Sequence, residues 1–334
     1  MGKKCLVIGG DGFLGSHLVD DLLSRGYEVR VFDRFSKGRI KNLKHLKGKI
    51  EFYKGNFLNK WQLSRAVKGA DYVFHFVSLS TPVSTANDPH AEIRLNLEGT
   101  LQLLDLCVKY GVKKVIYPSS GGAVYGNTLD EVASETTQAR PVSPYAVTKL
   151  AIEEHLHFYR RQHGLKFVVY RIANPYGERQ DPNGIQGAIP VFMKHMIKNE
   201  PLYIYGNTVR DYVYVKDVTG FIAENFFEKH NNSTYNIGSG KGVALFELVL
   251  MIAKTTQVIP KMKRRERRPF DVQKIVLDIS RANEEFGYYP ITSLEVGLEK
   301  TYAYLKEKYT HEPVVKMSWF DMGFIKSIKW NKLV

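Results

Sequence analysis

Apolar runs alternate with amphipathic segments along the chain up to Tyr170. The short runs are apolar at successive positions, which is typical of strands buried on both faces, whereas the longer segments repeat with helical spacing. Repeated β-α-β units of this kind predict an α/β fold, a doubly wound parallel sheet covered by helices on both faces. Strands are expected at 4–8, 28–32, 50–53, 72–77, 114–117 and 167–170, and helices at 13–24, 61–67, 91–109 and 145–163.

The pattern changes after Asn174, where shorter strands and helices follow one another. We therefore expect a second, smaller α/β lobe, with part of 205–235 returning to the main sheet. The last segment interleaves aromatic residues with lysines and is expected to pack on the body of the protein or on a second subunit. Attachment of this tail to a membrane surface is the alternative. The expected parts are a first domain over 1–173, the lobe over 174–312 and the tail over 313–334.

The composition is that of an ordinary globular protein, since 44% of the 334 residues are hydrophobic and 25% are charged. No apolar run approaches the roughly 20 residues needed to cross a bilayer, and no signal-peptide pattern begins the chain. The two cysteines, Cys5 and Cys107, lie in apolar segments, which argues against a disulfide framework and against a cysteine-based metal site. These features favour a reducing, cytoplasmic location.

The chain carries a net charge of +14, which is compatible with nucleic acid, a membrane surface or small anionic ligands as partners. Most of the basic residues are scattered along the chain. The one dense cluster, 261–268, belongs to no recognisable nucleic-acid-binding module. We therefore expect phosphate-bearing small molecules, rather than nucleic acid, to account for the charge.

Three glycines, Gly9, Gly12 and Gly15, directly follow the first expected strand and open the first expected helix. Here the chain has to turn tightly, and the missing side chains let a pyrophosphate reach backbone N–H groups at the start of the helix. Asp33 ends the second strand, where a carboxylate can accept hydrogen bonds from both hydroxyls of an adenosine ribose and repels a 2′-phosphate. The motif therefore predicts a dinucleotide site that favours NAD, although Arg34 leaves NADP open.

Tyr145 and Lys149 lie four residues apart on an expected helix, so their side chains share one face. Ser143 and Pro144 are typical of the start of such a helix. An ammonium beside a phenol lowers the pKa of the phenol from its usual value of about 10, which suits proton transfer near neutral pH. The same spacing recurs elsewhere in the chain, but only this pair follows a strand ending in two serines within the nucleotide-binding half.

Together these motifs resemble the extended short-chain dehydrogenase/reductase family, in particular its nucleotide-sugar (UDP-sugar) epimerase and dehydratase branch. The resemblance extends from about residue 3 to about residue 310. It implies a Rossmann-type fold in which 1–173 binds NAD and 174–312 binds the substrate. The segments that carry it are 9–15 (GGDGFLG), 75–78 (HFVS), 96–100 (NLEGT), 119–126 (SSGGAVYG), 143–149 (SPYAVTK), 171–177 (RIANPYG), 210–217 (RDYVYVKD) and 268–272 (RPFDV).

The resemblance also implies a role for each residue that matches a motif of the family. Tyr145 would be the catalytic acid/base, and Lys149 would hold the nicotinamide ribose while tuning Tyr145. Ser119 or Ser120 would reach the reacting sugar. The cofactor would be bound by Gly9, Gly12, Phe13, Leu14, Gly15, Asp33, Asn56, Phe57, Val77, Asn96, Tyr145 and Lys149. The substrate would be bound by Ala123, by Asn174, Arg210 and Arg268 at the diphosphate, and by Asp271 at the nucleotide ribose.

The chain departs from the family's usual pattern in two places. Gly121 stands where the family usually has Ser or Thr to contact the reacting hydroxyl, and Ala123 stands where dehydratases and decarboxylases have Glu. Asn56 replaces an Asp that commonly contacts adenine, a change that keeps a hydrogen-bonding side chain. Dehydration or decarboxylation would be expected to need an acidic residue near Ala123. C4 epimerisation needs only a base, a hydride acceptor and room for a ketone to turn over.

We therefore expect an NAD-dependent nucleotide-sugar 4-epimerase that acts on a UDP-hexose or a UDP-N-acetylhexosamine through a 4-keto intermediate. The alternatives are a net oxidoreductase (a 4-reductase or dehydrogenase) on a nucleotide sugar and a catalytically silent dinucleotide-binding protein. No grouping of side chains in the sequence predicts a metal site. The resemblance implies a homodimer built by the helices 95–109 and 145–163, and it leaves the sugar and the base open.

Overall fold

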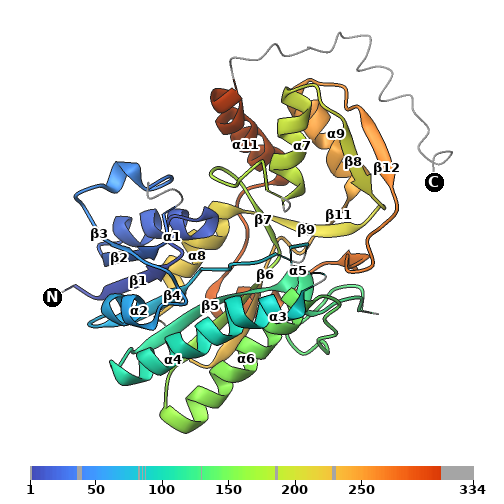
Figure 1. The fold of residues 1–334 in the computed structure, drawn as a ribbon. Helices are drawn as coiled ribbons and strands as arrows, with labels where there is room; N and C mark the ends of the chain where they lie inside the picture. Colours follow the sequence, from blue (N-terminus) through green and yellow to red (C-terminus); the bar gives the residue numbers. More distant parts are fainter. Residues whose placement is uncertain are drawn as a thin grey trace.

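The computed structural model describes residues 2–35, 40–81, 83–84, 86, 88–128, 130–184, 187–227 and 231–309. The expected tail, 313–334, lies outside these residues, and so do the alternatives for where it packs. The described part consists of a large parallel sheet covered by helices and a smaller lobe above it (Figure 1). No described helix combines the length and the apolar composition that a bilayer crossing requires.

Seven strands form the main sheet in the order β10-β6-β5-β4-β1-β2-β3, with every neighbouring pair parallel. The strand order reverses at β1, and open α/β sheets bind their ligands beyond the carboxyl ends of the strands at such a point. The seventh strand, β10, joins the main sheet after the chain has begun the lobe. The strands are β1 (Lys4–Ile8), β2 (Glu28–Asp33), β3 (Glu51–Lys54), β4 (Tyr72–His75), β5 (Lys114–Ser120), β6 (Phe167–Ile172) and β10 (Ser233–Ile237).

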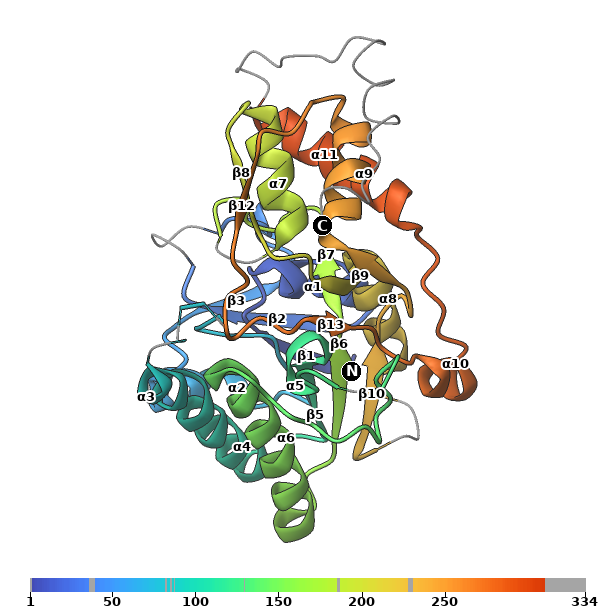
Figure 2. The same cartoon turned by 90° about the vertical axis from the view of Figure 1, so that its right-hand side faces the viewer.

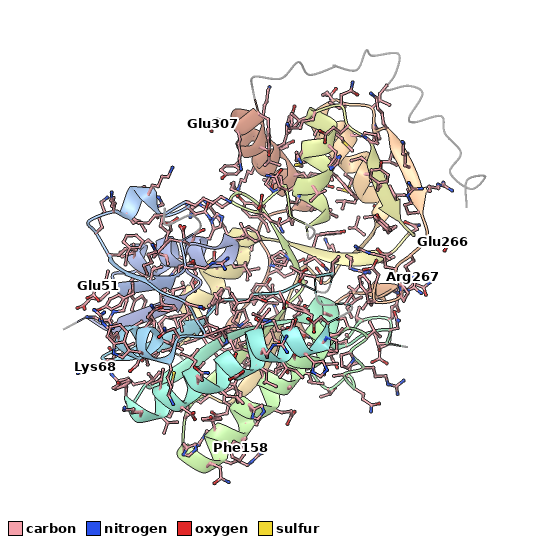
Figure 3. All side chains as sticks on the ribbon, viewed as in Figure 1. Glu51, Lys68, Phe158, Glu266, Arg267 and Glu307 are labelled. Atoms are coloured by element: carbon pink, nitrogen blue, oxygen red, sulfur yellow. The ribbon has the colours of Figure 1, made fainter. Side chains whose placement is uncertain are left out.

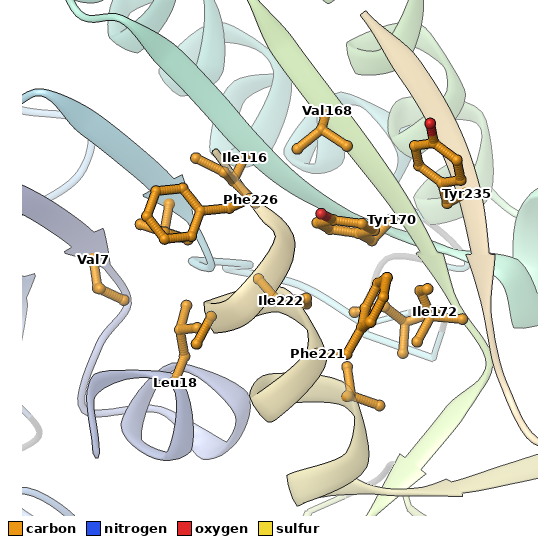
Figure 4. Packing of buried hydrophobic residues seen from close by; sticks show 14 of the residues in the cluster. Val7, Leu18, Ile116, Val168, Tyr170, Ile172, Phe221, Ile222, Phe226 and Tyr235 are labelled. Carbon is orange, nitrogen blue, oxygen red and sulfur yellow. The ribbon is translucent and has the colours of Figure 1, made fainter. Parts of the chain in front are cut away.

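Different helices cover the two faces of this sheet (Figure 2). Successive residues of β1 point to opposite faces, so Val7 belongs to one apolar cluster and Leu6 to the other. In the first cluster, Val7 lies with Leu18 of α1 and Phe226 at the end of α8 (Figure 4). One face is covered by α1 (Phe13–Ser24), α8 (Val215–Asn225) and α10 (Ser280–Phe286), and the other by α2 (Lys60–Val67), α4 (Gly99–Lys109) and α6 (Pro144–His163).

The lobe combines three helices with two small sheets around its own apolar core, which includes Met193, Leu248 and Leu298. Its longest strand, β9, ends where α8 begins. Because α8 packs on a face of the main sheet, this stretch of chain links the lobe to that sheet. The helices are α7 (Ala188–Ile197), α9 (Leu245–Thr256) and α11 (Leu294–Tyr309). One sheet contains β7 (Asn174–Tyr176), β9 (Val209–Tyr214), β11 (Gly242–Ala244) and β13 (Lys274–Ile275), and the other pairs β8 (Leu202–Tyr205) with β12 (Met262–Arg265).

Two elements differ from the sequence prediction in ways that affect the site. β5 continues beyond Tyr117 through Ser120, because its backbone goes on pairing with β6 after the apolar run has ended. The helix expected at 91–109 begins at α3 (Pro89–Glu92) and passes through a π-helical segment, η3 (Ile93–Glu98), before α4. Two short helices, η2 (Lys44–Leu46) and α5 (Gly121–Val124), complete the described elements.

Candidate active site

The glycine turn after β1 leaves no room for side chains on its inner side. A Cβ on Gly15 would lie 2.3 Å from the carbonyl oxygen of Gly9, and one on Gly9 would lie 2.7 Å from the backbone nitrogen of Val77. Gly9 also has a φ of +79°, a left-handed conformation that favours glycine. Gly12 is the N-cap of α1 and supplies no capping side chain. The turn therefore presents bare backbone N–H groups at the start of α1, a cradle that fits a pyrophosphate.

Asp33 lies beside this turn at the end of β2. Its Oδ2 accepts a hydrogen bond from the N–H of Asp11 at 3.0 Å, and burial raises the pKa of its carboxyl. Sequence reasoning did not single out Asp11, whose carboxylate accepts hydrogen bonds from the backbone N–H groups of residues 41–43. The signal that could have identified Asp11 is an acidic residue inside a glycine turn. The hydrogen bonds of Asp11 hold residues 41–43, which follow β2, against this turn.

Tyr145 and Lys149 lie on the first turns of α6, whose start is capped by Ser143 Oγ accepting from the N–H of Ala146. Lys149 Nζ donates to the carbonyl oxygen of Pro118 on β5 at 2.9 Å and lies 5.7 Å from the centroid of the Tyr145 ring. Lys149 also lines a small cavity together with Val77, the residue against which Gly9 packs. The phenol and the ammonium are therefore together at the end of β5, and Val77 connects them to the glycine turn.

Burial dominates the electrostatics of this pair. It lowers the pKa of Lys149 to about 8, against the opposing effect of the carboxylates of Glu92 and Glu153. It raises the pKa of Tyr145, and Glu92 adds to the rise while a hydrogen bond with Ser120 opposes it. The expectation that the pKa of Tyr145 lies below its usual value is therefore wrong for the protein by itself, because desolvation of the phenolate and the charge of Glu92 raise it.

The two serines that end β5 make different contacts. Ser119 is buried, and its Oγ donates to Oε1 of Glu153. Ser120 instead forms a hydrogen bond with Tyr145. Of the two candidates, Ser120 is the one that reaches the phenol.

The stretch that follows β5, 121–124, contains neither a hydroxyl nor an acidic side chain. Leu277 occupies the space in front of Gly121, where a Cβ would lie 2.5 Å from Leu277 Cδ1. Ala123 lies in the short helix α5 and is half-buried. Ser120 is therefore the hydroxyl that accompanies Tyr145 at this end of the sheet.

A second group of predicted residues meets on β9 and on the chain before β13. Nε of Arg268 lies 2.8 Å from Oδ2 of Asp271 in an ion pair. Arg210 donates to the backbone carbonyls of Val209 and Val272. Burial lowers the pKa of Arg210, and the neighbouring cations, Arg268 among them, lower it further. This concentration of positive charge suits the oxygens of a diphosphate.

Two aromatic residues that sequence reasoning missed flank Arg268. Its guanidinium carbon lies 4.8 Å from the centroid of the Tyr205 ring and 5.3 Å from that of Phe270. Tyr205 is 37% exposed, so part of its ring remains open to solvent. Buried and exposed residues alternate along β8, but its sequence, LYIY, contains no charged residue or amide, so no local signal marked Tyr205 as a surface position.

Asn174 lies between this group and the end of β5. Its Nδ2 donates to the carbonyl oxygen of Asp211, the residue after Arg210 on β9. A Cβ on Gly122, which precedes Ala123 in α5, would lie 3.3 Å from the same Nδ2. Asn174 therefore contacts both β9 and α5, the elements that carry the other predicted substrate residues.

Two predicted cofactor residues belong to the first turn of α1. Phe13 and Leu14 are partly buried and pack against the core of the lobe. The glycine turn is therefore in direct contact with the lobe as well as with the main sheet.

The remaining predicted cofactor residues lie around β3, β4 and η3. Phe57 is buried, with its ring 5.3 Å from that of His75, and its neighbour Asn56 is exposed. The side chain of Asn96 is held inside the protein. Its Oδ1 accepts from the N–H of Leu79, and its Nδ2 donates to Oγ of Ser80 and to Oε1 of Glu92.

Within the described ranges, no three or more His, Cys, Asp and Glu side chains are grouped so that they could hold a metal ion. Cys5 and Cys107 are buried free thiols. Burial raises the pKa of Cys5 to about 12, so its sulfur is protonated and unreactive near neutral pH.

A doubly wound sheet, a glycine turn after β1 and a Tyr–Lys pair beside β5 define a dinucleotide-dependent enzyme of the short-chain dehydrogenase/reductase type. The sequence profile of the NAD dependent epimerase/dehydratase family matches residues 5–238, and the chain belongs to this family. The family is NAD dependent, as its name states.

The chain is also similar to individual epimerases over nearly its whole length. It is 33% identical to a putative UDP-glucose 4-epimerase of Methanocaldococcus jannaschii over 307 residues, which are 90% of this chain and 98% of that protein. The crystal structure of UDP-glucose 4-epimerase with UDP-glucose from Thermotoga maritima matches with a TM-score of 0.86 and 37% identity, over 91% of this chain and 99% of that one. UDP-glucose 4-epimerase of Thermus thermophilus in complex with NAD matches with a TM-score of 0.85 and 35% identity, over the same shares, 91% and 99%.

Proposed function

We propose that this protein is an NAD-dependent 4-epimerase of a nucleotide sugar, a UDP-hexose or a UDP-N-acetylhexosamine. The observation that supports the proposal is that the end of β5, where Tyr145 and Lys149 lie, is linked to two regions suited to different ligands. Val77 links it to the glycine turn, and Asn174, next to α5, links it to β9, which carries Arg210. A sugar held by its diphosphate at the arginines would extend toward Tyr145 and meet the cofactor's reactive ring there.

NAD fits the first of these regions. The backbone N–H groups at the start of α1 suit the pyrophosphate, and the carboxylate of Asp33 favours an adenosine ribose that carries no phosphate. Bound between these residues, NAD would supply the hydride chemistry, acceptance of a hydride from C4 of the sugar and its return to the other face of the same carbon.

Tyr145 would remove the proton from the C4 hydroxyl and give it back once the 4-keto sugar has turned over. Its raised pKa keeps the proton on the phenol before ligands bind, although Lys149 lies nearby, with Nζ 5.7 Å from the Tyr145 ring. Lys149 would make the phenol a base only together with the positive charge of oxidised NAD, and it would also hold the nicotinamide ribose. Ser120 would share the proton with Tyr145. By the resemblance to the family, a Ser or Thr at position 121 would have this function.

The nucleotide would be held by the lobe. Arg210 and Arg268 suit the diphosphate, and Asp271 can turn from its ion pair with Arg268 to a ribose hydroxyl. The half-exposed ring of Tyr205 offers a face on which a base can stack. Asn174 can donate to the substrate between the diphosphate and the sugar.

The stretch 121–124 supports epimerisation over dehydration or decarboxylation, because it carries no acidic side chain. The small side chain of Ala123 and the absence of one at Gly122 also leave room for a ketone to turn. The similarity to proteins named UDP-glucose 4-epimerase points the same way. A net oxidoreductase on a nucleotide sugar remains the second candidate, favoured by the same NAD-dependent pair, Tyr145 and Lys149.

We also propose which part of the chain binds each ligand and which helices form a dimer. Residues 1–173, with the returning strand β10, would bind NAD, and 174–312 would bind the nucleotide sugar. A homodimer through 95–109 and 145–163 would suit the exposed apolar side chains of α6. The two free thiols fit a reducing, cytoplasmic setting.

The test begins with mass spectrometry of the ligands released from purified protein, where we expect NAD. Incubation with UDP-glucose or UDP-N-acetylglucosamine, without added cofactor, should then produce the C4 epimer, and Tyr145→Phe should abolish the conversion. Reduced cofactor that accumulates in step with substrate would favour the oxidoreductase. Tight binding of NAD without turnover of any nucleotide sugar would overturn the enzyme proposal and leave a silent dinucleotide-binding protein.

A further inference from the structure

Lys149 lines a small cavity, mostly apolar by area, together with residues of β4, β5, α3 and η3. The cavity offers about 10 Å³ to the centre of a water molecule, which is room for about one water. Two polar atoms of its lining, Nδ1 of His75 and the hydroxyl of Tyr117, are buried and have no hydrogen-bond partner within the part of the chain that the structure describes. Their side chains are 3% and 1% exposed. Buried polar groups are rarely left unpaired, and ordered water is a common partner.

The hydrogen bonds on the other side of the His75 ring determine which nitrogen carries its proton. Thr100 has a single hydroxyl hydrogen, which Oγ1 donates to the carbonyl oxygen of Asn96 at 2.6 Å. The 2.7 Å contact between Thr100 Oγ1 and His75 Nε2 is therefore donated by Nε2. Burial lowers the pKa of His75 to about 3, so the ring is neutral and Nδ1 is an acceptor without a hydrogen.

Among the polar groups that line the cavity are two acceptors and two donors that a water could join. The acceptors are Nδ1 of His75 and the carboxylate of Glu92, which is 1% exposed and whose Oε1 is held by Nδ2 of Asn96 at 2.8 Å. The donors are the hydroxyl of Tyr117 and the ammonium of Lys149, whose Nζ lies 4.7 Å from the Tyr117 ring. Because a water molecule offers two hydrogens and two lone pairs, one water can pair with the two atoms that lack a described partner, His75 Nδ1 and the Tyr117 hydroxyl, and still has one hydrogen and one lone pair for Glu92 and Lys149.

We propose that this cavity is a site for one buried water molecule, and that Glu92 acts across it as a positioning residue that keeps the Lys149 ammonium charged. Desolvation favours the neutral amine of Lys149, so a carboxylate facing it is needed to hold the proton near neutral pH. The role of Glu92 in turnover rests on the proposed epimerase reaction, whereas the water site and the charge of Lys149 do not. The titratable groups facing Lys149 are Glu92 from α3, His75 from β4, Tyr117 from β5, and Tyr145 and Glu153 from α6.

The water site is tested by crystallography and by a matched pair of variants. A crystal structure of the NAD-loaded enzyme should contain a water within hydrogen-bond distance of His75 Nδ1 and the Tyr117 hydroxyl. Tyr117→Phe removes a ligand of that water and should lower the melting temperature. Tyr170→Phe is the control, because it removes another buried hydroxyl that lacks a described partner but lies outside the cavity lining. A cavity without water in the crystal, or a rise in melting temperature for both variants, would overturn the site.

The role of Glu92 is tested on the charge of Lys149 directly. In protein labelled with ¹³C-lysine, the signal of Lys149 should titrate near pH 8, where burial sets its pKa. Glu92→Gln should lower this midpoint by about one unit, equivalent to a tenfold weaker hold on the proton. Glu98→Gln is the control, since Glu98 lies on η3 and is exposed.

The two readouts separate this inference from the proposed reaction. If the protein turns over no nucleotide sugar, the NMR midpoint and the crystal structure still decide the inference. In active enzyme, Glu92→Gln should also move the basic limb of the kcat profile to lower pH, and Glu98→Gln should leave it in place. An unchanged Lys149 midpoint in Glu92→Gln would contradict the role of Glu92.

Discussion

Glu153 and Arg171 form an ion pair in the interior of the protein, with Nη2 of Arg171 donating to Oε2 of Glu153 at 2.7 Å. Both residues are buried, at 2% and 8% exposure, and Nε of Arg171 also donates to the carboxylate. Ser119 Oγ donates to Oε1 of Glu153, and the hydroxyl of Tyr125 accepts from Nη1 of Arg171 at 3.0 Å. Since Glu153 lies one turn after Lys149 on α6, this network fixes the helix against the ends of β5 and β6.

Removing one charge from this pair should destabilise the fold. Glu153→Gln leaves the guanidinium of Arg171 buried without its anion, a change that typically costs about 3–5 kcal/mol. We expect the free energy of unfolding, measured by urea titration, to fall by about 3 kcal/mol. Glu154→Gln, at the exposed next position, should change it by less than about 0.5 kcal/mol. Equal effects of the two variants would contradict the importance of the pair.

The regular part of the fold could be read from the sequence because local signals mark the ends of its elements. The strand expected at 4–8 and the helix expected at 13–24 agree with β1 and α1 residue for residue, since an apolar run, a glycine turn and an amphipathic repeat adjoin there. The apolar run predicts only 114–117 for β5, and the two serines at its end, Ser119 and Ser120, belong to the strand through their pairing with β6. That pairing depends on residues about 50 positions later in the chain.

The candidate site, like the fold, could be predicted where local motifs mark it and could not be predicted where contacts between distant residues form it. Residues that form local motifs, such as the glycine turn and the pair Tyr145–Lys149, could be predicted from their spacing together with their position after an expected strand. Glu92 and Tyr205 could not, because each matters through contacts with residues distant in sequence. The direction of the pKa shift of Tyr145 was wrong for a related reason, since burial raises the pKa and burial is not visible in a spacing pattern.

Introducing the hydroxyl that the family usually has at position 121 should be unfavourable in this protein. The Cβ of Gly121→Ser would lie 2.5 Å from Leu277 Cδ1 and 3.0 Å from the carbonyl oxygen of Arg171. Overpacking of this kind costs about 1–3 kcal/mol, so the melting temperature should fall. Gly122→Ser is the control, because its nearest contact, Nδ2 of Asn174 at 3.3 Å, is a side-chain atom that needs to move little.

A double variant distinguishes the contact with Leu277 from backbone strain. Leu277→Ala removes the side chain that fills the space in front of Gly121. The combination of Leu277→Ala with Gly121→Ser should then be more stable than the sum of the two single effects by at least about 0.5 kcal/mol. Strict additivity in denaturant titrations would show that Leu277 is not what excludes a side chain at 121.

His17 should make the protein sensitive to mild acid. It is buried on α1, and its Nε2 donates to the carbonyl oxygen of Glu178 at 2.9 Å. Burial lowers the pKa of His17 from 6.5 to about 4, so the unfolded chain binds a proton more readily than the folded protein does. Stability is therefore fully present above pH 6.5 and is lost as the pH falls toward 4. Between pH 7 and pH 5 this group should remove about 2 kcal/mol from the free energy of unfolding.

The variant His17→Gln isolates this contribution, because an amide nitrogen can keep the hydrogen bond to Glu178 but does not titrate. Urea titrations at pH 7 and pH 5 should show a smaller loss of stability for His17→Gln than for the unchanged protein, by about 2 kcal/mol. His163→Gln, at the exposed end of α6, is the control and should behave like the unchanged protein. Equal losses in His17→Gln and in the unchanged protein would assign the acid sensitivity to other groups.

The proposed homodimer gives the exposed side of α6 a function. Phe158 is 45% exposed on the outside of this helix (Figure 3), and Val147 on the same helix is 52% exposed. A charge placed in an apolar interface leaves a buried ion without a partner, so Phe158→Lys should convert the dimer into a monomer of 38.2 kDa. Trp61→Lys on α2 is the control, because Trp61 is 67% exposed and lies outside the proposed interface. Light scattering after size exclusion measures both masses. A dimer in both variants, or a monomer in the unchanged protein, would contradict an interface through α6.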